Sequence, residues 1–119
     1  MDTPEHADSV PSTRLTIVVK DGSGAVTWTL TCDPPGGSHP NPTGACTALA
    51  RATRPFDPVP ADVNCTDVWG GPETATIRGV WRGEPVDASY KKTNGCEIAR
   101  WNQIAAALGG GARPAPDLT

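Results

Sequence analysis

The stretch LTIVVKDGSGAVTWTLTC, residues 15–32, decides the fold class of this chain. Its first part, Leu15–Lys20, is rich in β-branched residues, and Asp21–Gly24 has the composition of a tight turn. In Ala25–Cys32 apolar residues alternate with threonines, a period of two that is typical of a strand with one buried face. A helix would spread those threonines around its circumference. The stretch therefore predicts a β-hairpin whose buried face includes Val26, Trp28, Leu30 and Cys32.

A second hairpin is predicted over residues 74–92. Residues 74–82 alternate as the first hairpin does, and Gly83-Glu84 predicts the turn into the next strand. Gly79, inside the first of these strands, indicates a bulge or the close approach of another backbone. Trp81 is expected to lie in the core.

Helices are predicted between the hairpins and after them. Thr43 can cap a helix over residues 44–53, which places four residues on one side: Ala45, Cys46, Leu49 and Ala52. Asn94 and Glu97 have the spacing of a capping box, and residues 98–108 carry apolar side chains at helical intervals. The chain thus predicts an α+β fold, an antiparallel sheet of four to five strands with two helices packed on one face.

The ordered domain is predicted to span residues 14–108. Residues 1–13 are polar and contain proline, which predicts a flexible N-terminal segment. Residues 109–119 begin with a glycine run that ends the second helix, and they are expected to form a disordered tail. A length of 119 residues has room for a single core.

Charge and hydropathy exclude several classes of partner. The net charge of −3 and the pI near 5.2 offer no basic surface for nucleic acid or for an anionic membrane. No apolar run approaches the roughly 18–20 residues that span a bilayer. The N-terminus has no charged-then-apolar signal segment, so we interpret Met1 as a start codon placed on a mature secreted sequence. The sequence is also compatible with a native cytosolic start at Met1.

The sequence contains no motif of an enzyme, a metal site or a cofactor site. There is no Gly-x-Ser-x-Gly, no glycine-rich phosphate loop and no His-Glu-x-x-His. The chain has no Cys-x-x-Cys, and His6 and His39 are not spaced as zinc ligands. His39 is expected to form a structural hydrogen bond rather than to catalyse. We therefore predict a protein without enzymatic activity, cofactor or metal.

The cysteines indicate an oxidised framework. Cys32, Cys46, Cys65 and Cys96 allow three pairings, and an even number in a small proline-rich chain favours export. We favour the pairs Cys32–Cys46 and Cys65–Cys96. The second pair would close a loop of about 32 residues and stabilise the fold by roughly 3–4 kcal/mol on the chain-entropy model.

The candidate functional segment is the Cys65–Pro72 loop. Nearby prolines oppose a helix, while Thr66 and Val68 favour extended backbone. Such a stiff segment can enter a protease cleft as a substrate does, or it can be a long connection held by a disulfide. The residue chemistry alone leaves both interpretations open.

Several short motifs together carry a family resemblance. In order, they are Leu30-Thr31-Cys32, His39-Pro40, Gly44-Ala45-Cys46, Val63-Asn64-Cys65, Gly79-Val80-Trp81 with Gly83, and Tyr90 with Asn94-Gly95-Cys96-Glu97. Their order and spacing resemble the Streptomyces subtilisin inhibitors, the SSI family. The resemblance implies a five-stranded antiparallel sheet with two helices, the same cysteine pairs, a secreted actinobacterial protein and a homodimer formed through the sheet.

The resemblance also implies roles in the loop. The reactive-site loop would consist of Cys65, Thr66, Asp67, Val68 and Trp69, with Asp67–Val68 as the scissile bond. Asp67 would fill the primary specificity pocket, and Val68 and Trp69 would lie on the leaving-group side. Cys96 and Asn94 would support the loop, Asn94 either by bracing it or by capping a helix. The implied partner is an extracellular serine protease, subtilisin-like or specific for acidic residues.

This chain departs from the family at the contact residue and at the C-terminal end. Family members usually place Met, Lys or Arg where this chain has Asp67. A carboxylate loses its hydration in an apolar pocket, so we expect weak inhibition of trypsin-like and chymotrypsin-like enzymes. Residues 101–108 also predict helix where the family has a closing strand, which leaves the fifth strand and the dimer open.

The departure at Asp67 keeps an alternative function open. An SSI-like binding module, or a substrate of another enzyme, would share this fold without inhibiting serine proteases. An SSI-like domain could also inhibit another protease class through a different surface.

Overall fold

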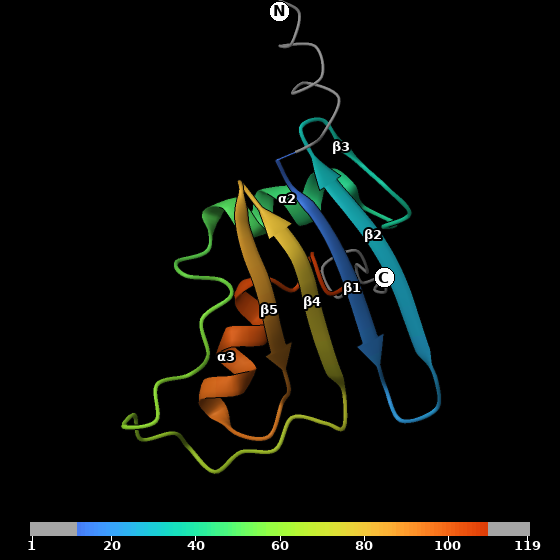
Figure 1. The fold of residues 1–119 in the computed structure, drawn as a ribbon. Coiled ribbons are helices and arrows are strands. Elements are labelled where there is room, and N and C mark those ends of the chain that lie inside the picture. Colours follow the sequence, from blue (N-terminus) through green and yellow to red (C-terminus); the bar gives the residue numbers. More distant parts are fainter. Residues whose placement is uncertain (1–11, 110–119) are drawn as a thin grey trace, which may run out of the picture.

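The computed structural model describes residues 12–109, which form a five-stranded antiparallel sheet with two helices on one face (Figure 1). The strands are β1 (Arg14–Lys20), β2 (Ala25–Cys32), β3 (Pro35–Gly36), β4 (Thr74–Trp81) and β5 (Glu84–Tyr90), in the order β3-β2-β1-β4-β5. The helices are α2 (Pro42–Arg51) and α3 (Gly95–Gln103). The predicted fold class is confirmed. No helix within residues 12–109 is long and apolar enough to cross a bilayer.

The first hairpin forms as predicted. β1 pairs with β2 from Arg14↔Thr31 to Lys20↔Ala25, and Ile17 and Leu30 on its inner face are fully buried. Val26 is 47% exposed, although its register places it on the same inner face. It lies beside the hairpin turn, where Figure 1 shows neither helix reaching across the sheet. The alternation therefore predicted the face of Val26 correctly, and its burial wrongly.

The second hairpin turns one residue earlier than predicted. β5 begins at Glu84, which pairs with Trp81, so the turn consists of Arg82 and Gly83. Both turn residues have positive φ, 50° and 85°, as a two-residue hairpin turn that matches the strand twist requires. Trp81 is half-buried at the border of the core rather than inside it, and it packs edge-on against Phe56 at 5.8 Å between ring centroids.

The fifth strand is β3, which lies in the connection between the first hairpin and α2. Pro35 and Gly36 pair with Cys32 and Thr31 at the free edge of β2. This pairing depends on how the chain reverses after β2, and a two-residue strand has no periodicity of its own. The sheet therefore reaches five strands without any strand from the C-terminal part of the described chain.

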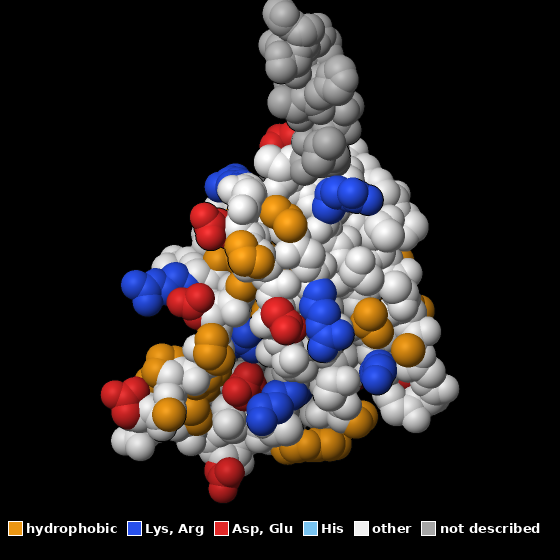
Figure 2. Space-filling view, in the orientation of Figure 1, with side chains coloured by type: hydrophobic (Ala, Val, Ile, Leu, Met, Phe, Trp, Pro, Cys, Tyr) orange, Lys and Arg blue, Asp and Glu red, His pale blue; other side chains and the backbone are white. Residues whose placement is uncertain are grey.

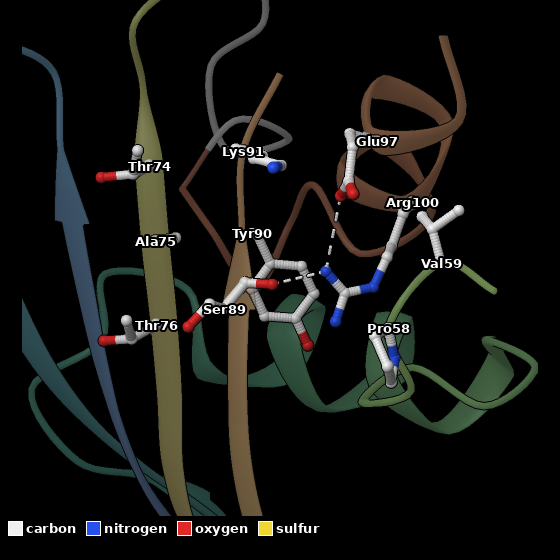
Figure 3. Close-up of a pocket in the computed structure, with 10 residues that line it drawn as sticks. All are labelled: Pro58, Val59, Thr74, Ala75, Thr76, Ser89, Tyr90, Lys91, Glu97 and Arg100. Carbon is white, nitrogen blue, oxygen red and sulfur yellow. Dashed lines mark hydrogen bonds and ion pairs between the residues drawn. The ribbon is translucent and has the colours of Figure 1, made fainter. Parts of the chain in front are cut away.

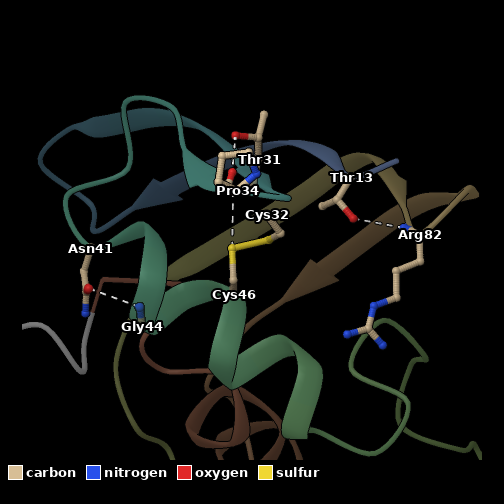
Figure 4. Close-up of a disulfide and its surroundings, with 8 residues drawn as sticks. All are labelled: Thr13, Thr31, Cys32, Pro34, Asn41, Gly44, Cys46 and Arg82. Atoms are coloured by element: carbon tan, nitrogen blue, oxygen red, sulfur yellow. Dashed lines mark hydrogen bonds between the residues drawn. A yellow bond between two sulfur atoms is a disulfide. The ribbon is translucent and has the colours of Figure 1, made fainter. Parts of the chain in front are cut away.

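Helix α2 begins before the predicted cap. Its N-cap is Asn41, whose Oδ1 accepts a hydrogen bond from the Gly44 backbone nitrogen at 3.1 Å (Figure 4). Pro42 occupies the first helical turn, where its missing N–H costs nothing, so Thr43 lies inside the helix. The Cys32–Cys46 disulfide joins this helix to β2, as predicted.

The C-terminal part of the described chain supplies core residues from tight turns. Helix α3 ends at Gln103, earlier than predicted, and hydrogen bonds of the i→i+3 type continue to Leu108. Ile104, Ala107 and Leu108 all face the core there, with exposures of 0%, 0% and 4%. No strand forms between Gly95 and Gly109.

His39 is a structural hydrogen-bonding residue, as predicted. It is 3% exposed, its Nε2 lies 2.9 Å from the Ala107 carbonyl oxygen, and its Nδ1 accepts from the Asn41 backbone nitrogen at 2.9 Å. Nε2 therefore donates to Ala107. The imidazole connects the C-terminal turns to the start of α2.

The predictions for the chain ends fall mostly on residues 1–11 and 110–119, outside the described part. Thr13, the last residue of the predicted N-terminal segment, is 1% exposed. Its hydroxyl accepts a hydrogen bond from the Arg82 backbone nitrogen at 3.0 Å (Figure 4).

Gly79 brings two backbones together, as predicted. It has φ +138° and pairs with Leu15, and a Cβ at this position would collide with the Arg14 carbonyl oxygen. Gly79→Ala should therefore destabilise the fold by about 2–4 kcal/mol, from backbone strain and the collision together. Urea unfolding measures the loss.

The matched control is Gly22→Ala. Gly22 also has positive φ, +94°, but nothing lies within 4 Å of a Cβ there, so its loss should be only about 1 kcal/mol. Equal losses in the two variants would contradict the close approach at Gly79.

Candidate functional site

The Cys65–Pro72 loop lies at one end of the sheet, beside the start of α3 (Figure 1). It belongs to the connection between α2 and β4, residues 52–73, which contains neither helix nor strand. Asp67 is exposed, and Val68 and Trp69 are 53% and 67% exposed. These three consecutive side chains therefore project into solvent from irregular backbone.

Three links tie the loop to residues 92–96 on both sides of the exposed triplet. The Cys65–Cys96 disulfide, with an S–S distance of 2.04 Å, confirms the second predicted pair. The Thr66 carbonyl oxygen accepts a hydrogen bond from the Gly95 nitrogen at 2.9 Å. The Gly70 nitrogen donates to the Lys92 carbonyl oxygen at 2.7 Å. The backbone from residue 67 to residue 69 is thus suspended between fixed points.

Glycines allow the loop and α3 to touch. A Cβ on Gly95 would collide with Thr66 Oγ1, and a Cβ on Gly70 would lie 2.8 Å from Ile98 Cδ1 and 3.2 Å from Lys92 Cβ. A side chain on Gly70 would therefore require the loop or the Ile98 side chain to shift. The hydrogen bonds at both ends therefore depend on small residues.

Arg100 of α3 holds the first half of the connection. Its Nε donates to the Asp57 carbonyl oxygen at 2.7 Å, and its Nη1 donates to the Ser89 carbonyl oxygen at the free edge of β5. The guanidinium also lies 4.0 Å from the centroid of the Tyr90 ring (Figure 3). Nη1 is 3.8 Å from Glu97 Oε1. One side chain thus joins α3, β5 and the segment that leads into the loop.

Tyr90 adds a second hold on this segment. Its hydroxyl donates to the Pro55 carbonyl oxygen at 2.8 Å. Burial raises the pKa of Tyr90 to about 12, although the nearby Arg100 opposes the shift. The hydroxyl therefore keeps its proton, and this hydrogen bond, throughout the neutral and mildly alkaline range.

Asn94 caps α3. Its Oδ1 accepts from the Glu97 nitrogen at 2.9 Å, the bond that the capping-box spacing predicted. The contact with the loop is made by the next residue, through the Gly95 nitrogen. Bracing of the loop by the Asn94 side chain stays a prediction.

The surface around the loop is acidic and apolar. Between Pro55 and Pro72 the chain carries Asp57, Asp62 and Asp67 and no Lys or Arg. Figure 2 shows acidic side chains along the lower left border of the molecule, with hydrophobic side chains between them. A partner bound here meets negative charge and exposed apolar groups together.

Within residues 12–109 the groups that most often serve in catalysis are engaged in structural contacts. A hollow of about 420 Å³ opens beside β5, but Glu97 and Arg100 in its wall interact with each other (Figure 3). Both ring nitrogens of His39 are already in hydrogen bonds, so it has no free base for a triad. Within residues 12–109 no three His, Cys, Asp or Glu side chains are grouped to hold a metal ion.

Residues 11–94 match the model of the subtilisin inhibitor-like family, SSI. The chain belongs to this family. Kexstatin-1 of Streptomyces platensis is 40% identical over 96 residues, which cover 72% of this chain and 66% of that protein. Protease inhibitor SIL-V5 of Streptomyces luteoverticillatus is 36% identical over 94 residues, or 71% and 86% of the respective chains.

A solved structure agrees with the SSI fold. Sermetstatin of Streptomyces caespitosus, in complex with subtilisin of Bacillus licheniformis, has a TM-score of 0.50 and 25% identity, over 80% of this chain and 94% of that chain. The SSI relatives are protease inhibitors, which fits the prediction that this member is not an enzyme.

The sequence predicted part of this arrangement. It paired Cys65 with Cys96, and it selected the segment that the structure leaves exposed. It missed Gly70, Gly95 and Arg100, whose contacts join parts of the chain that are distant in sequence. Gly70 was predicted only as part of the Cys65–Pro72 loop, and Gly95 had no predicted role of its own, although its neighbours Asn94 and Cys96 were predicted to support the loop.

Gly70→Ala tests the hold on the loop. The added Cβ should push the loop away from Ile98 and Lys92 and weaken the bond of the residue 70 nitrogen. Residues 66–70 should then be cut on the order of tenfold faster in limited proteolysis, because local opening becomes easier. Gly24→Ala is the control, since no atom lies within 4 Å of its Cβ. Equal cleavage rates in the two variants would contradict the contact.

Proposed function

We propose that this chain is a secreted serine-protease inhibitor that presents Asp67–Val68 as a substrate-like bond. The observation that supports it most is the exposed triplet at residues 67–69, linked to residues 92–96 on both sides. A protease must bind its substrate in extended form, and ordering a free peptide costs binding energy. The links remove most of that cost in advance.

The same links explain how such a bond resists turnover. After cleavage of Asp67–Val68, Cys65 and Thr66 stay attached on one side and Gly70 on the other. The new amine therefore remains beside the acyl group, where resynthesis competes with hydrolysis. The complex is a slow, reversible trap.

Asp67 determines the class of target. Its carboxylate loses several kcal/mol of hydration in an apolar pocket and regains it only beside a cation. The acidic neighbours Asp57 and Asp62 add charge of the same sign. We propose a serine protease with a basic primary pocket, specific for acidic residues.

Trp69 is the proposed anchor on the leaving-group side. Its ring is 67% exposed and Val68 is 53% exposed, so both have area to bury in a complex. Aromatic residues at the centre of an interface of about 1,600 Å² often supply much of its binding energy.

The other parts of the proposal rest on the family and the disulfides. The complex of sermetstatin with subtilisin supports a serine protease as partner. Two disulfides support an oxidising, extracellular location. The sheet face opposite the helices carries exposed Thr16 and Thr29 and half-buried Thr76, and we propose it as the surface of a homodimer.

A second candidate function comes from one relative. The transglutaminase-activating metalloprotease inhibitor of Streptomyces mobaraensis is 36% identical over 74 residues, 59% of this chain and 49% of that protein. On this second proposal, the chain inhibits a metalloprotease through a surface other than the Cys65–Pro72 loop. A panel in which only metalloproteases are inhibited would favour this candidate.

Asp67→Met tests the assignment of the contact residue. Removing the carboxylate from an apolar pocket should lower the inhibition constant for subtilisin at least about tenfold. Asp62→Met is the matched control, because Asp62 is an exposed aspartate outside the Cys65–Pro72 loop. No gain with Asp67→Met, or an equal gain with Asp62→Met, would refute Asp67 as the residue in the pocket.

A further inference from the structure

The Asn94-Gly95 pair is chemically reactive and lies at the anchor of the loop. Asn41, Asn64 and Asn102 are followed by Pro, Cys and Gln, so this is the single Asn-Gly pair in the sequence. A glycine after asparagine leaves its backbone nitrogen unhindered by a side chain. Asn-Gly pairs in flexible chains therefore lose ammonia spontaneously in neutral water.

The reaction needs no partner except water. The Gly95 nitrogen would attack Cγ of Asn94, a bond would form between these atoms, and the bond from Cγ to Nδ2 would break. The amide leaves as ammonia, with the proton that the Gly95 nitrogen gives up. Water then opens the cyclic imide at either carbonyl carbon. The products are aspartate or isoaspartate at position 94.

In the folded chain both reacting groups are engaged. The nucleophile, the Gly95 nitrogen, donates to the Thr66 carbonyl oxygen at 2.9 Å. The electrophilic amide is held by its oxygen, since Asn94 Oδ1 accepts from the Glu97 nitrogen at 2.9 Å. Asn94 is also fixed in extended backbone, with φ −158° and ψ 176°. Ring closure would require both hydrogen bonds to break.

One of these two hydrogen bonds, from the Gly95 nitrogen to Thr66, is made by the loop. Thr66 is next to Asp67 in the chain, and it follows Cys65, whose disulfide partner Cys96 comes directly after Gly95. We propose that Asn94 is a deamidation site that the Cys65–Pro72 loop keeps closed, so that opening the loop starts the reaction. Deamidation at Asn94 thereby marks the chains in which the loop has opened.

The two products differ in their effect on the loop. Aspartate keeps a side-chain oxygen for the cap, and its charge is favourable at a helix N-terminus. Isoaspartate adds a carbon to the main chain between residue 94 and the Gly95 nitrogen. That nitrogen then moves away from Thr66 while Cys96 stays bound to Cys65. An isoaspartate form would hold a cut loop poorly, and this consequence rests on the proposed inhibitory function.

The test measures the chemistry at residue 94 without any protease partner. Wild-type protein, a Cys65→Ser/Cys96→Ser variant and the denatured, reduced chain are incubated at neutral pH. Peptide mapping by mass spectrometry then follows the conversion at Asn94, and isoaspartate methyltransferase labels the isoaspartate product. Circular dichroism checks that the variant stays folded. If it does not fold, folded wild-type protein in which the Cys65–Cys96 disulfide alone is reduced and alkylated replaces it.

We expect Asn94 to react on the order of tenfold or more slowly in wild-type protein than in the opened variant and the denatured chain, because ring closure must break the hydrogen bonds. Asn102, whose following glutamine side chain hinders attack by the next backbone nitrogen, should react far more slowly than Asn94 in the opened samples and serves as the internal reference. Asn94→Ser, which keeps a capping oxygen but has no amide, should show no conversion.

Two results would overturn the proposal. Equal deamidation rates in wild-type and denatured protein would show that the two hydrogen bonds do not slow the reaction. A deamidation rate in the opened variant as slow as in wild-type protein would show that the loop does not protect Asn94. Because no protease is present, neither result depends on whether the chain is an inhibitor.

Discussion

The attachment of the Cys65–Pro72 loop to residues 92–96 is the constraint on which the site depends. A disulfide and two backbone hydrogen bonds hold both sides of three exposed residues. Arg100 and Tyr90 secure the segment that leads into the loop, and α3 is itself seated on the sheet by buried Trp101. The loop is therefore rigid because it is linked to α3, and α3 packs against the core.

On the proposed function, these links separate affinity from specificity. The hydrogen bonds use backbone atoms of Thr66, Gly70, Lys92 and Gly95, so they make no demand on the side chains between them. Asp67 can thus replace an apolar or basic residue without loss of the loop conformation. On the proposed function, the scaffold determines how the bond is presented, and residues 67–69 select the protease. Asp67 would then reflect a change of target rather than a defect of folding.

The parts of the fold with a strong local signal could be predicted from the sequence. Alternating threonines predicted the first hairpin, and the spacing of Asn94 and Glu97 predicted the start of α3. The pairing of β3 could not be predicted, because two residues carry no period. The predicted burial of Val26 was wrong for a related reason, because alternation identifies a face of the sheet but not whether a helix covers it.

The disulfide and the exposed segment of the candidate site could be predicted, but the residues that hold the loop against α3 could not. Cysteine pairing and the family resemblance located the exposed segment. Gly70 and Gly95 could not be recognised as contact residues, since a glycine shows its need for space only when its neighbour in the fold is known. Arg100 likewise bonds to residues 43 and 11 positions away in the chain. Such contacts come from tertiary packing and have no local pattern.

The most direct measurement of the central claim is the fate of the Asp67–Val68 bond during long incubation with a serine protease specific for acidic residues. The account predicts a single slow cut at this bond that stops at a mixture of cut and intact chains, both still bound to the enzyme. Rapid degradation, or a first cut at another bond, would contradict it.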